Sequence, residues 1–369
     1  MRFICDKQAL SGALQIVSRA IPAKTTMSIL QCVLMEAEDE GIRLTANDME
    51  LGVETLIDGE VEEPGIIAIE EKIFYDIVRK LPDGEIHITT DPSMKVTIQS
   101  GKAKFNLIGR STEEFTYLPQ VERIDSIRLS QYSLKSIISQ TIFSTKNDET
   151  NKMMGGELIQ IDQDMFKMVS LDGHRISIRR IRLSGQYAPR KVVVPGKTLD
   201  DISRILSDST ESDVQITFTG KHVVFDFDRT TVVSRLLEGE YFAIDQMLSS
   251  DFATKMSINR RQLLDCLDRT TLLVRENDKK PVIMNITDSQ LMLKIRSTIG
   301  SMDEEIDLEK QGQDQMIGFN PRFLLDALRA IDDETVDFYF VNPKAPCFIK
   351  DAEESYIYLI LPVNFTVVD

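Results

Sequence analysis

The chain has 369 residues and carries 43 lysines and arginines against 59 aspartates and glutamates, so its formal net charge is −16 at pH 7. A chain of this length exceeds what one hydrophobic core usually organises, which predicts several domains. Negative charge spread evenly over the surface would exclude nucleic acid as a partner, so a role on nucleic acid requires a local basic strip.

Each third of the chain opens with a short alternating strand that runs directly into an amphipathic helix. The strands are predicted at residues 1–6, 126–130 and 255–259, and the helices at residues 7–20, 131–144 and 260–273. A second helix follows in each third, with further alternating strands at residues 85–89, 96–100, 214–218, 223–227, 336–340 and 356–361. This order predicts an α+β fold in which two helices per unit are backed by antiparallel sheets.

The second helix of each third carries the same charge signature, repeated at intervals of 125 residues. Its members are a cation, an aspartate and an arginine: Lys72, Asp76 and Arg79, then Lys197, Asp201 and Arg204, then Arg322, Asp326 and Arg329. Apolar residues keep the same register: Phe74, Ile77 and Leu81, then Leu199, Ile202 and Leu206, then Leu324, Ala327 and Ile331. The chain is therefore predicted to contain three similar copies of one structural unit.

Short linkers near residues 121–126 and 248–251 separate the three copies. The predicted domains are residues 1–124, 125–249 and 250–369. Linkers this short favour units that pack in a rigid row.

The cysteines and the apolar segments of the chain indicate its cellular location. Cys5, Cys32, Cys266 and Cys347 are dispersed and form no CxxC pair, which favours reduced thiols over a disulfide framework or a zinc site. The first residues lack the pattern of a signal peptide, and the strongest apolar run, residues 356–363, is too short to cross a bilayer. We expect a cytoplasmic protein without membrane association, metal or cofactor.

The two cations of each signature lie seven residues apart, close to two helical turns, so both project away from the apolar stripe. With Lys24 and Lys80 they form the predicted DNA-binding set: Lys24, Lys72, Arg79, Lys80, Lys197, Arg204, Arg322 and Arg329. Other helix cations extend this set: Lys7, Arg19, Lys135, Lys146 and Arg260. Such point charges suit phosphate contacts that carry no sequence information. The alternative is a solvated helix face, on which each signature aspartate pairs with the arginine three residues later.

Four further segments point to a family: SLDGHRISIRR at 170–180, LLEGEYF at 236–242, SGKAKFNL at 100–107 and YLILPV at 358–363. With these segments and its three-unit length, the whole chain resembles the bacterial sliding clamp family, the beta subunit of the replicative DNA polymerase. The resemblance implies a head-to-tail homodimer that closes a ring around duplex DNA, with helices lining the bore. It also implies binding to the polymerase catalytic subunit, the clamp loader complex and other proteins with a clamp-binding motif, and no catalytic site.

A head-to-tail ring needs two different surfaces that complement each other, one at each end of the protomer. In the first unit the resemblance implies a basic and apolar surface at Lys95, Lys102, Lys104, Phe105 and Leu107. In the third unit it implies an acidic and apolar surface at Leu272, Leu273, Asp303, Glu304 and Glu305. Opposite charges around an apolar centre would give both register and affinity. Alternatively, the alternating lysines only protect an exposed strand edge against aggregation.

The partners of the family insert a short peptide with apolar anchors between the second and third units. The matching positions imply a cleft lined by Met154, Leu171, Gly173, His174, Arg175, Ile176, Phe242, Met247, Leu359, Leu361, Pro362 and Val363. Methionine and aliphatic side chains suit a site that accepts many partners, because they repack readily. Alternatively, the C-terminal residues Leu359, Leu361 and Val363 only pack the core face of a strand. Phe242, Gln246 and Asn364 depart from the usual family pattern, so we expect a different peptide preference.

Two other functions fit parts of the sequence. A scaffold of three repeats could bind peptides without DNA, and it would show no topological retention on circular DNA. Asp172 and His174 could serve as a base with its orienting group, or as metal ligands of a hydrolase. A turn with a nearby histidine is the simpler interpretation, because the sequence contains no P-loop, dinucleotide fingerprint or nucleophile elbow.

Overall fold

The computed structural model describes residues 1–146, 150–248, 251–274 and 280–365 of the chain. These residues form two compact units. The first contains Met1–Lys135 and Asp201–Leu236, and the second contains Ser136–Asp200 and Leu237–Asp369. The predicted middle repeat contributes residues to both units, so the sequence repeats and the compact units divide the chain differently.

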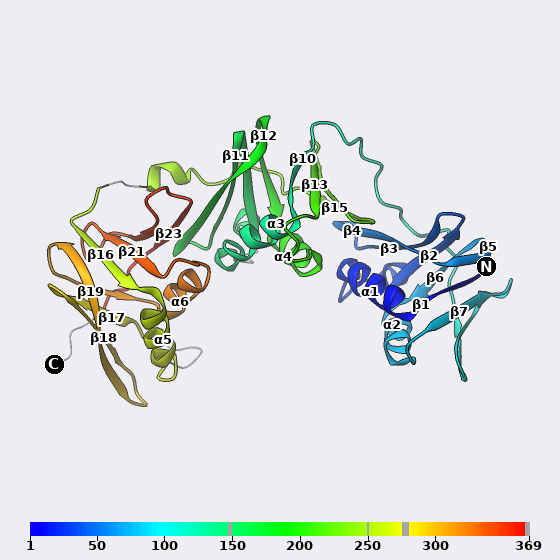
Figure 1. Cartoon of the computed structure of the whole chain (residues 1–369), viewed down its shortest axis with the longest axis horizontal. Coiled ribbons are helices and arrows are strands. Elements are labelled where there is room, and N and C mark those ends of the chain that lie inside the picture. Colours follow the sequence, from blue (N-terminus) through cyan, green and yellow to red (C-terminus); the bar gives the residue numbers. More distant parts are fainter. Residues whose placement is uncertain (147–149, 249–250, 275–279, 366–369) are drawn as a thin grey trace. The chain divides into compact units, whose positions relative to one another are not determined.

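Two antiparallel sheets build the first unit (Figure 1). The five-stranded sheet has the order β5-β1-β7-β8-β9, and the eight-stranded sheet has the order β10-β13-β14-β15-β4-β3-β2-β6. The strands are β1 (Arg2–Asp6), β2 (Cys32–Glu38), β3 (Gly41–Asn47), β4 (Leu51–Ile57), β5 (Glu60–Glu63), β6 (Gly65–Glu70), β7 (Glu85–Thr90), β8 (Lys95–Ser100), β9 (Ala103–Ile108), β10 (Ile127–Ser130), β13 (Asp213–Phe218), β14 (His222–Phe227) and β15 (Thr230–Arg235). Strand β9 ends its sheet, so one of its two edges pairs with no other described strand.

Helices α1 (Lys7–Val17) and α2 (Glu71–Lys80) pack against each other in the first unit. Asp6 caps α1, because its carboxylate accepts hydrogen bonds from the backbone N–H groups of Gln8 at 2.7 Å and Ala9 at 3.0 Å. Each helix buries one apolar stripe at helical spacing, and the cations of α2 stay exposed.

One ten-stranded antiparallel sheet builds the second unit, in the order β11-β12-β23-β22-β21-β16-β19-β18-β17-β20. Its strands are β11 (Gly156–Leu171), β12 (Arg175–Pro195), β16 (Thr254–Asn259), β17 (Val282–Ile286), β18 (Gln290–Arg296), β19 (Ser301–Gly312), β20 (Gln315–Phe319), β21 (Thr335–Phe340), β22 (Cys347–Lys350) and β23 (Tyr356–Ile360). The long strands β11 and β12 form a hairpin, which turns at residues 172–174.

The remaining α-helices among the described residues belong to the middle and third repeats. Helices α3 (Gln131–Ser139) and α4 (Gly196–Ile205) each have residues in both compact units. Helices α5 (Arg260–Thr271) and α6 (Pro321–Arg329) pack together in the second unit. Asn320 caps α6 by accepting a hydrogen bond from the backbone N–H of Arg322 at 3.0 Å. The prediction of two helices per repeat with antiparallel sheets is confirmed.

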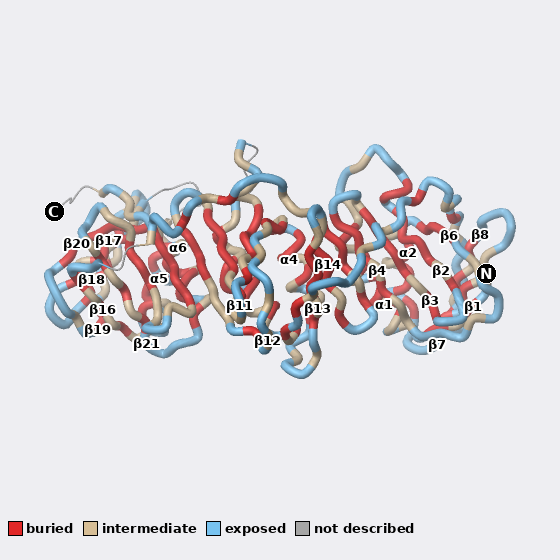
Figure 2. The backbone as a smooth tube through the Cα atoms, turned by 90° about the horizontal axis from the view of Figure 1, so that it is seen from above, coloured by how far each residue is buried: buried red, intermediate tan, exposed pale blue. Residues whose placement is uncertain are grey.

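The repeated apolar register forms the core. All nine positions predicted to face inward from α2, α4 and α6 are at most 8% exposed. Figure 2 shows buried residues in red along the helices and strands of both units. The first predicted helix ends slightly early: the α-helix stops at Val17, and residues Ser18–Ala20 continue as a 3-10 turn.

The sheets continue from one repeat into the next. In the first unit β4 of the first repeat pairs with β15 of the middle repeat, for example Glu54 with Thr231. In the second unit β12 of the middle repeat pairs with β23 of the third, for example Ser177 with Tyr358. The repeats are therefore joined by backbone hydrogen bonds as well as by linkers. The predicted boundary between residues 249 and 250 lies outside the described residues.

All four cysteines are free and buried. Burial raises the pKa of the Cys5 thiol to about 12, so this thiol stays protonated and unreactive at neutral pH. Within the described part of the chain, no helix combines the length and the apolar character that crossing a membrane requires.

Candidate functional site

The cations of the predicted DNA-binding set lie on the surface. All eight are exposed: Lys24, Lys72, Arg79, Lys80, Lys197, Arg204, Arg322 and Arg329. Four of them form no ion pair with another described residue, namely Lys24, Lys72, Lys80 and Arg322. These charges are therefore available to an anion in solution.

The central aspartates of the three signatures have different partners. Asp76 pairs with Arg79 on its own helix at 3.2 Å, as expected. Asp201 contacts Arg19 at 3.7 Å. The expected pairing is wrong for Asp326, because its carboxylate instead reaches Arg175 on β12, at 2.6 Å.

Several cations of the wider set are held by the protein itself. The contacts are Lys7 with Asp83 at 2.9 Å, Lys135 with Asp208 at 2.7 Å, and the Arg260 guanidinium with the carbonyl oxygens of Asp333 at 2.8 Å and Leu328 at 3.2 Å. Arg260 thus supports the C-terminal turn of α6 and the loop after it. These side chains mainly stabilise the fold. The eight exposed cations therefore remain the better candidates for phosphate contacts.

Many of the predicted cleft residues meet in one apolar cluster of the second unit. Its buried members are Leu158, Val169, Leu171, Ile176, Ile178, Val193, Tyr241, Ile244, Phe348, Ile357 and Leu359, with Met153, Met154, Leu237, Phe242, Leu248 and Tyr339 packed against them. Leu359 is only 4% exposed, so the core interpretation holds for this residue. Leu361 and Met247 keep 36% and 52% of their surfaces exposed, so they remain available to a ligand.

The hairpin tip between β11 and β12 is shaped by Asp172. Its carboxylate accepts hydrogen bonds from the backbone N–H of His174 at 3.0 Å and of Arg175 at 3.1 Å. Gly173 has a φ of +86°, a left-handed conformation that glycine adopts at little cost. Because these contacts engage the carboxylate, Asp172 serves to build the turn.

Arg175 joins this tip to two other segments of the second unit. Its guanidinium donates to Asp172 Oδ2 at 2.9 Å, to Asp326 Oδ2 at 2.6 Å and to the carbonyl oxygen of Phe143. It also lies over the ring of Phe323 on α6, 4.4 Å from the centroid. The side chain is only 11% exposed, so each of these contacts replaces lost hydration.

The C-terminal segment is anchored at both ends of the predicted cleft residues Leu361, Pro362 and Val363. The backbone N–H of Leu361 donates to the carbonyl oxygen of His174 at 2.8 Å, and that of Val363 donates to Gly318 at 2.8 Å. A Cβ atom at Gly318 would lie 2.8 Å from the backbone carbonyl oxygen of Val363, so a side chain there would displace the anchored segment.

The basic interface residues lie on strands β8 and β9 and on the turn between them, which holds Lys102. Lys95, Lys102 and Lys104 are exposed, and Leu107 is half-buried. Phe105 pairs with Ile98 on the buried face of the sheet but remains 41% exposed, because the outer edge of β9 pairs with no other described strand. This arrangement places an apolar side chain between cations along an open strand edge.

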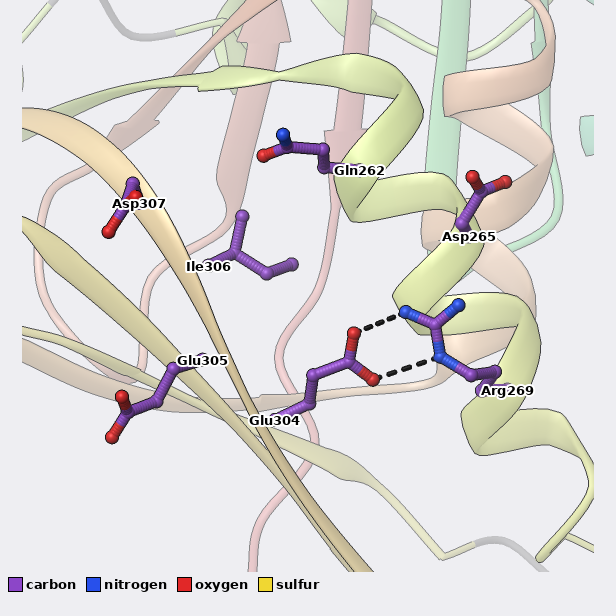
Figure 3. A pocket seen from close by; sticks show the side chains of 7 residues that line it. All are labelled: Gln262, Asp265, Arg269, Glu304, Glu305, Ile306 and Asp307. Carbon is purple, nitrogen blue, oxygen red and sulfur yellow. Dashed lines mark hydrogen bonds and ion pairs between the residues drawn. The ribbon is translucent and has the colours of Figure 1, made fainter.

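The acidic interface residues lie on β19 and beside α5. Leu272 is 77% exposed and Leu273 is half-buried at the end of α5. Asp303 pairs with Arg296 at 2.7 Å, and Glu304 forms two contacts with the guanidinium of Arg269 (Figure 3). Glu304 and Arg269 border a pocket of about 360 Å³ between α5 and β19. It is lined by Gln262, Asp265, Arg269, Glu304, Glu305, Ile306 and Asp307. Two of the three predicted carboxylates are therefore partly neutralised within the chain, and Glu305 is the more available one.

Glu157 is an unexpected buried acid beneath the apolar cluster. It is 0% exposed, and desolvation raises its pKa to about 8. The Thr141 hydroxyl lies 2.9 Å from the Ile137 carbonyl oxygen and 2.6 Å from Glu157 Oε2. Thr141 has one proton, so a protonated Glu157 can donate to Thr141 while Thr141 donates to Ile137.

Sequence reasoning missed the residues that surround the hairpin tip. Phe323 stacks on His174 with ring centroids 6.2 Å apart, and Phe143 and Asp326 contact Arg175. One available signal was the repeat itself: Phe323 occupies the position of Ile73 in the first repeat and of Thr198 in the middle repeat. An aromatic residue in only one copy indicates a contact that the other copies lack.

Family models of the DNA polymerase III beta subunit match the chain in three parts. The N-terminal domain model matches residues 1–119, the central domain model residues 128–242 and the C-terminal domain model residues 245–364. The beta sliding clamp of Staphylococcus aureus is 31% identical over 375 residues, and the alignment covers 99% of each chain.

Solved structures agree with this match. A putative DNA polymerase III beta subunit from Eubacterium rectale is 59% identical with a TM-score of 0.95, covering 99% of this chain and 100% of that one. The DNA polymerase sliding clamp from Bacillus subtilis is 30% identical, with the same TM-score and the same coverage. With all three domain models matched and the fold shared over its whole length, the chain belongs to the DNA polymerase III beta subunit family, the bacterial sliding clamps.

Proposed function

We propose that this chain is a DNA sliding clamp, a processivity factor that encircles duplex DNA and tethers the replicative polymerase. Family membership over the full chain carries this proposal. The repeated helices with exposed cations support it, because they offer phosphate contacts on a chain whose net charge is −16. The clamp acts as an accessory subunit, without a catalytic site of its own.

Weak contacts suit this role. A ring is retained on DNA by topology, so the cations need not hold any one phosphate tightly. Each phosphate neutralised contributes a slope of about −0.9 to the dependence of log affinity on log salt concentration. We propose that Lys24, Lys72, Lys80 and Arg322 make such interchangeable contacts, since the protein leaves their charges unpaired among the described residues.

The partner site is proposed at the apolar cluster and the C-terminal segment. Leu361 and Met247 present exposed apolar surface beside the buried Leu171, Ile176 and Leu359. Aliphatic and methionine side chains can repack around different peptides from the polymerase catalytic subunit, the clamp loader and other partners. The anchored backbone of Leu361 would keep the site in shape before a partner arrives.

Ring closure is proposed to join the open edge of β9 to the acidic surface near α5 of a second copy. Phe105 and Leu272 are apolar side chains that a monomer leaves exposed, and Lys104 and Glu305 carry opposite charges. Residues 301–307 of β19 pair with β18, while residues 308–312 pair with β16. The first stretch therefore has one strand edge without a described partner, which suits strand pairing across the interface.

The experiment that tests the ring compares nicked circular DNA with the same DNA after linearisation. Clamps are loaded with the clamp loader and ATP, the DNA is isolated by gel filtration, and retained protein is quantified. A ring stays on the circle and slides off the linear form. Equal retention on both would refute topological binding, and no retention with intact peptide binding would favour the peptide scaffold. We also propose a cytoplasmic location, where replication of the bacterial chromosome takes place.

The hydrolase alternative lacks support. Asp172 is engaged by the turn, and the His174 ring stacks on Phe323. The sliding clamp family is noncatalytic, so family membership argues against hydrolysis at this site.

A further inference from the structure

The contact between Asp326 and Arg175 connects a helix of the predicted DNA-binding set to the hairpin tip of the predicted cleft. Arg322 and Arg329 lie near each other on the exposed face of α6, because seven residues make almost two turns. Asp326 lies between them in sequence, and its side chain is 31% exposed. Its carboxylate nevertheless binds Arg175 at 2.6 Å, so this face of α6 also supports a different part of the unit.

The equivalent aspartate of the first repeat forms a different contact. Asp76 occupies the equivalent position on α2 and pairs with Arg79 of the same helix at 3.2 Å. Arg329, the equivalent of Arg79, pairs instead with Asp268 on α5 at 3.0 Å. The same charge signature therefore serves two structures: a local pair on α2, and a bridge between elements on α6.

We propose that Asp326 is a positioning residue for partner binding, which acts through Arg175. The inference rests on the proposed partner site. Arg175 requires acceptors because its side chain is 11% exposed, and Asp326 supplies a charged one. With Arg175 fixed, Asp172 and the tip keep their geometry.

The tip in turn positions the C-terminal segment. The carbonyl oxygen of His174 accepts the hydrogen bond from the backbone N–H of Leu361 at 2.8 Å. A chain of contacts thus runs from Asp326 to Arg175, through the tip, to the exposed apolar side chain of Leu361. Removing the charge of Asp326 loosens the partner site, although Asp326 itself lies outside the residues proposed to touch the peptide.

The test compares Asp326→Asn with Asp76→Asn, which removes the same charge from the equivalent position of α2. The probe is the purified polymerase catalytic subunit of the same organism, and binding is measured by surface plasmon resonance on immobilised clamp. We expect Asp326→Asn to weaken binding about tenfold, because the buried Arg175 keeps only one of its two charged acceptors, and Asp76→Asn to leave it unchanged. Asp326→Glu retains the carboxylate and should restore most of the affinity.

A double-mutant cycle of Arg175→Lys and Asp326→Asn provides a second measurement. Strongly non-additive losses are expected, since both changes act on one contact. Retention on circular DNA should be equal for Asp326→Asn and Asp76→Asn, which separates the effect on partner binding from a general loss of fold.

The outcomes separate this inference from the proposed function. If the unchanged clamp fails to bind the polymerase subunit, the partner site itself is wrong. If the unchanged clamp binds and Asp326→Asn binds equally well, or if the cycle is additive, Asp326 has no positioning role. Equal losses for Asp326→Asn and Asp76→Asn would also overturn the inference, because the effect would then come from charge alone.

Discussion

The last strands of the first and third repeats end in opposite environments. Among the described strands, β9 pairs with β8 only, whereas β23 lies between β22 and β12 and has five buried residues. Consequently Phe105 on β9 is 41% exposed, and Tyr358 on β23 is 1% exposed. Two copies of one unit thus give the chain an open edge at β9 and a filled edge at β23, and the proposed interface uses the open one.

The second helices of the same two repeats carry the same charges but form different contacts. Helices α2 and α6 share exposed cations at equivalent positions, yet their aspartates bind different partners. The comparison teaches that two repeats can keep the same exposed cations while the ion pairs of their equivalent aspartates differ. Each prediction below changes residues on one side of this comparison.

Substitutions at the open edge of β9 should have the largest effect, which is on dimer formation. Lys104→Glu with Phe105→Ala removes a cation and the exposed aromatic ring, and it is expected to convert the dimer into monomers. Sedimentation velocity at micromolar concentration measures the change. The control is Lys221→Glu with Ile66→Ala, a matched pair of exposed residues that belong neither to β8 or β9 nor to the proposed interface. A full dimer for Lys104→Glu with Phe105→Ala would refute the assignment of this edge.

The end of β23 should carry the next largest effect. Leu361→Ala removes an exposed apolar side chain and is expected to weaken polymerase binding by about 1 to 2 kcal/mol, as for an interface hot spot. Isothermal titration calorimetry measures this loss. Ile66→Ala, a truncation of similar exposure in the first repeat, serves as the control. An unchanged dissociation constant for Leu361→Ala would reject the proposed peptide contact.

The shared cations of α2 and α6 should give equal, smaller effects. Lys72→Gln with Arg79→Gln, and Arg322→Gln with Arg329→Gln, each remove two charges from one helix. Each pair is expected to lower the salt slope of DNA binding by about 1 for every cation that touches phosphate. Fluorescence anisotropy at several salt concentrations measures the slope. A change confined to one helix would show that the two repeats do not contact DNA alike.

The three repeats also differ at one buried position, which is Glu157 in the middle repeat. The equivalent residues of the first and third repeats are Cys32 and Val282, and all three side chains are 0% exposed. Folding raises the pKa of Glu157 from its ordinary value of 4.5 to about 8, so the folded chain binds more protons within that window. Its contribution to stability therefore falls as pH rises from about 4.5 to 8, by up to about 1.4 kcal/mol per pH unit.

Glu157→Val introduces the residue of the third repeat and should remove this pH dependence. Thermal unfolding followed by circular dichroism should show a variant that is several degrees more stable at pH 8.5, with a smaller gap at pH 5.5. Glu309→Gln, at an exposed strand position, controls for the loss of one acidic side chain. A gap that stays constant with pH would contradict the buried, protonated state of Glu157.

The repeated elements could be predicted because their signals are local. Helical spacing identified the buried faces of α2, α4 and α6, and alternation identified the strands that open each repeat. The exposed positions of the signature cations follow from the same spacing. The site residues stay predictions in their roles, although the structure does bring Met154, Leu171, Ile176, Phe242 and Leu359 into one cluster.

The lateral contacts could not be predicted, because they join residues far apart in sequence. The pair of Asp326 with Arg175 links the third repeat to the middle one, and no periodicity encodes which carboxylate reaches which guanidinium. The expected pair of Asp326 with Arg329 is chemically sound, but Arg175 offers a more buried partner and Arg329 turns to Asp268. Likewise, the contacts of Arg269 with Glu304 and of Arg296 with Asp303 could not be predicted, and they leave Glu305 as the most available of the three predicted interface acids.

The unpaired edge of β9 has a mechanical consequence for loading. Within the first unit, every described strand of both sheets pairs with a neighbouring strand of the same chain, although the outer edge of β9 stays open. Separating two protomers at this edge therefore breaks only the contacts of the seam and exposes none of the buried core. We expect a clamp loader to open the ring by spreading one seam while every unit stays folded, so that opening and reclosing can be repeated in each loading cycle.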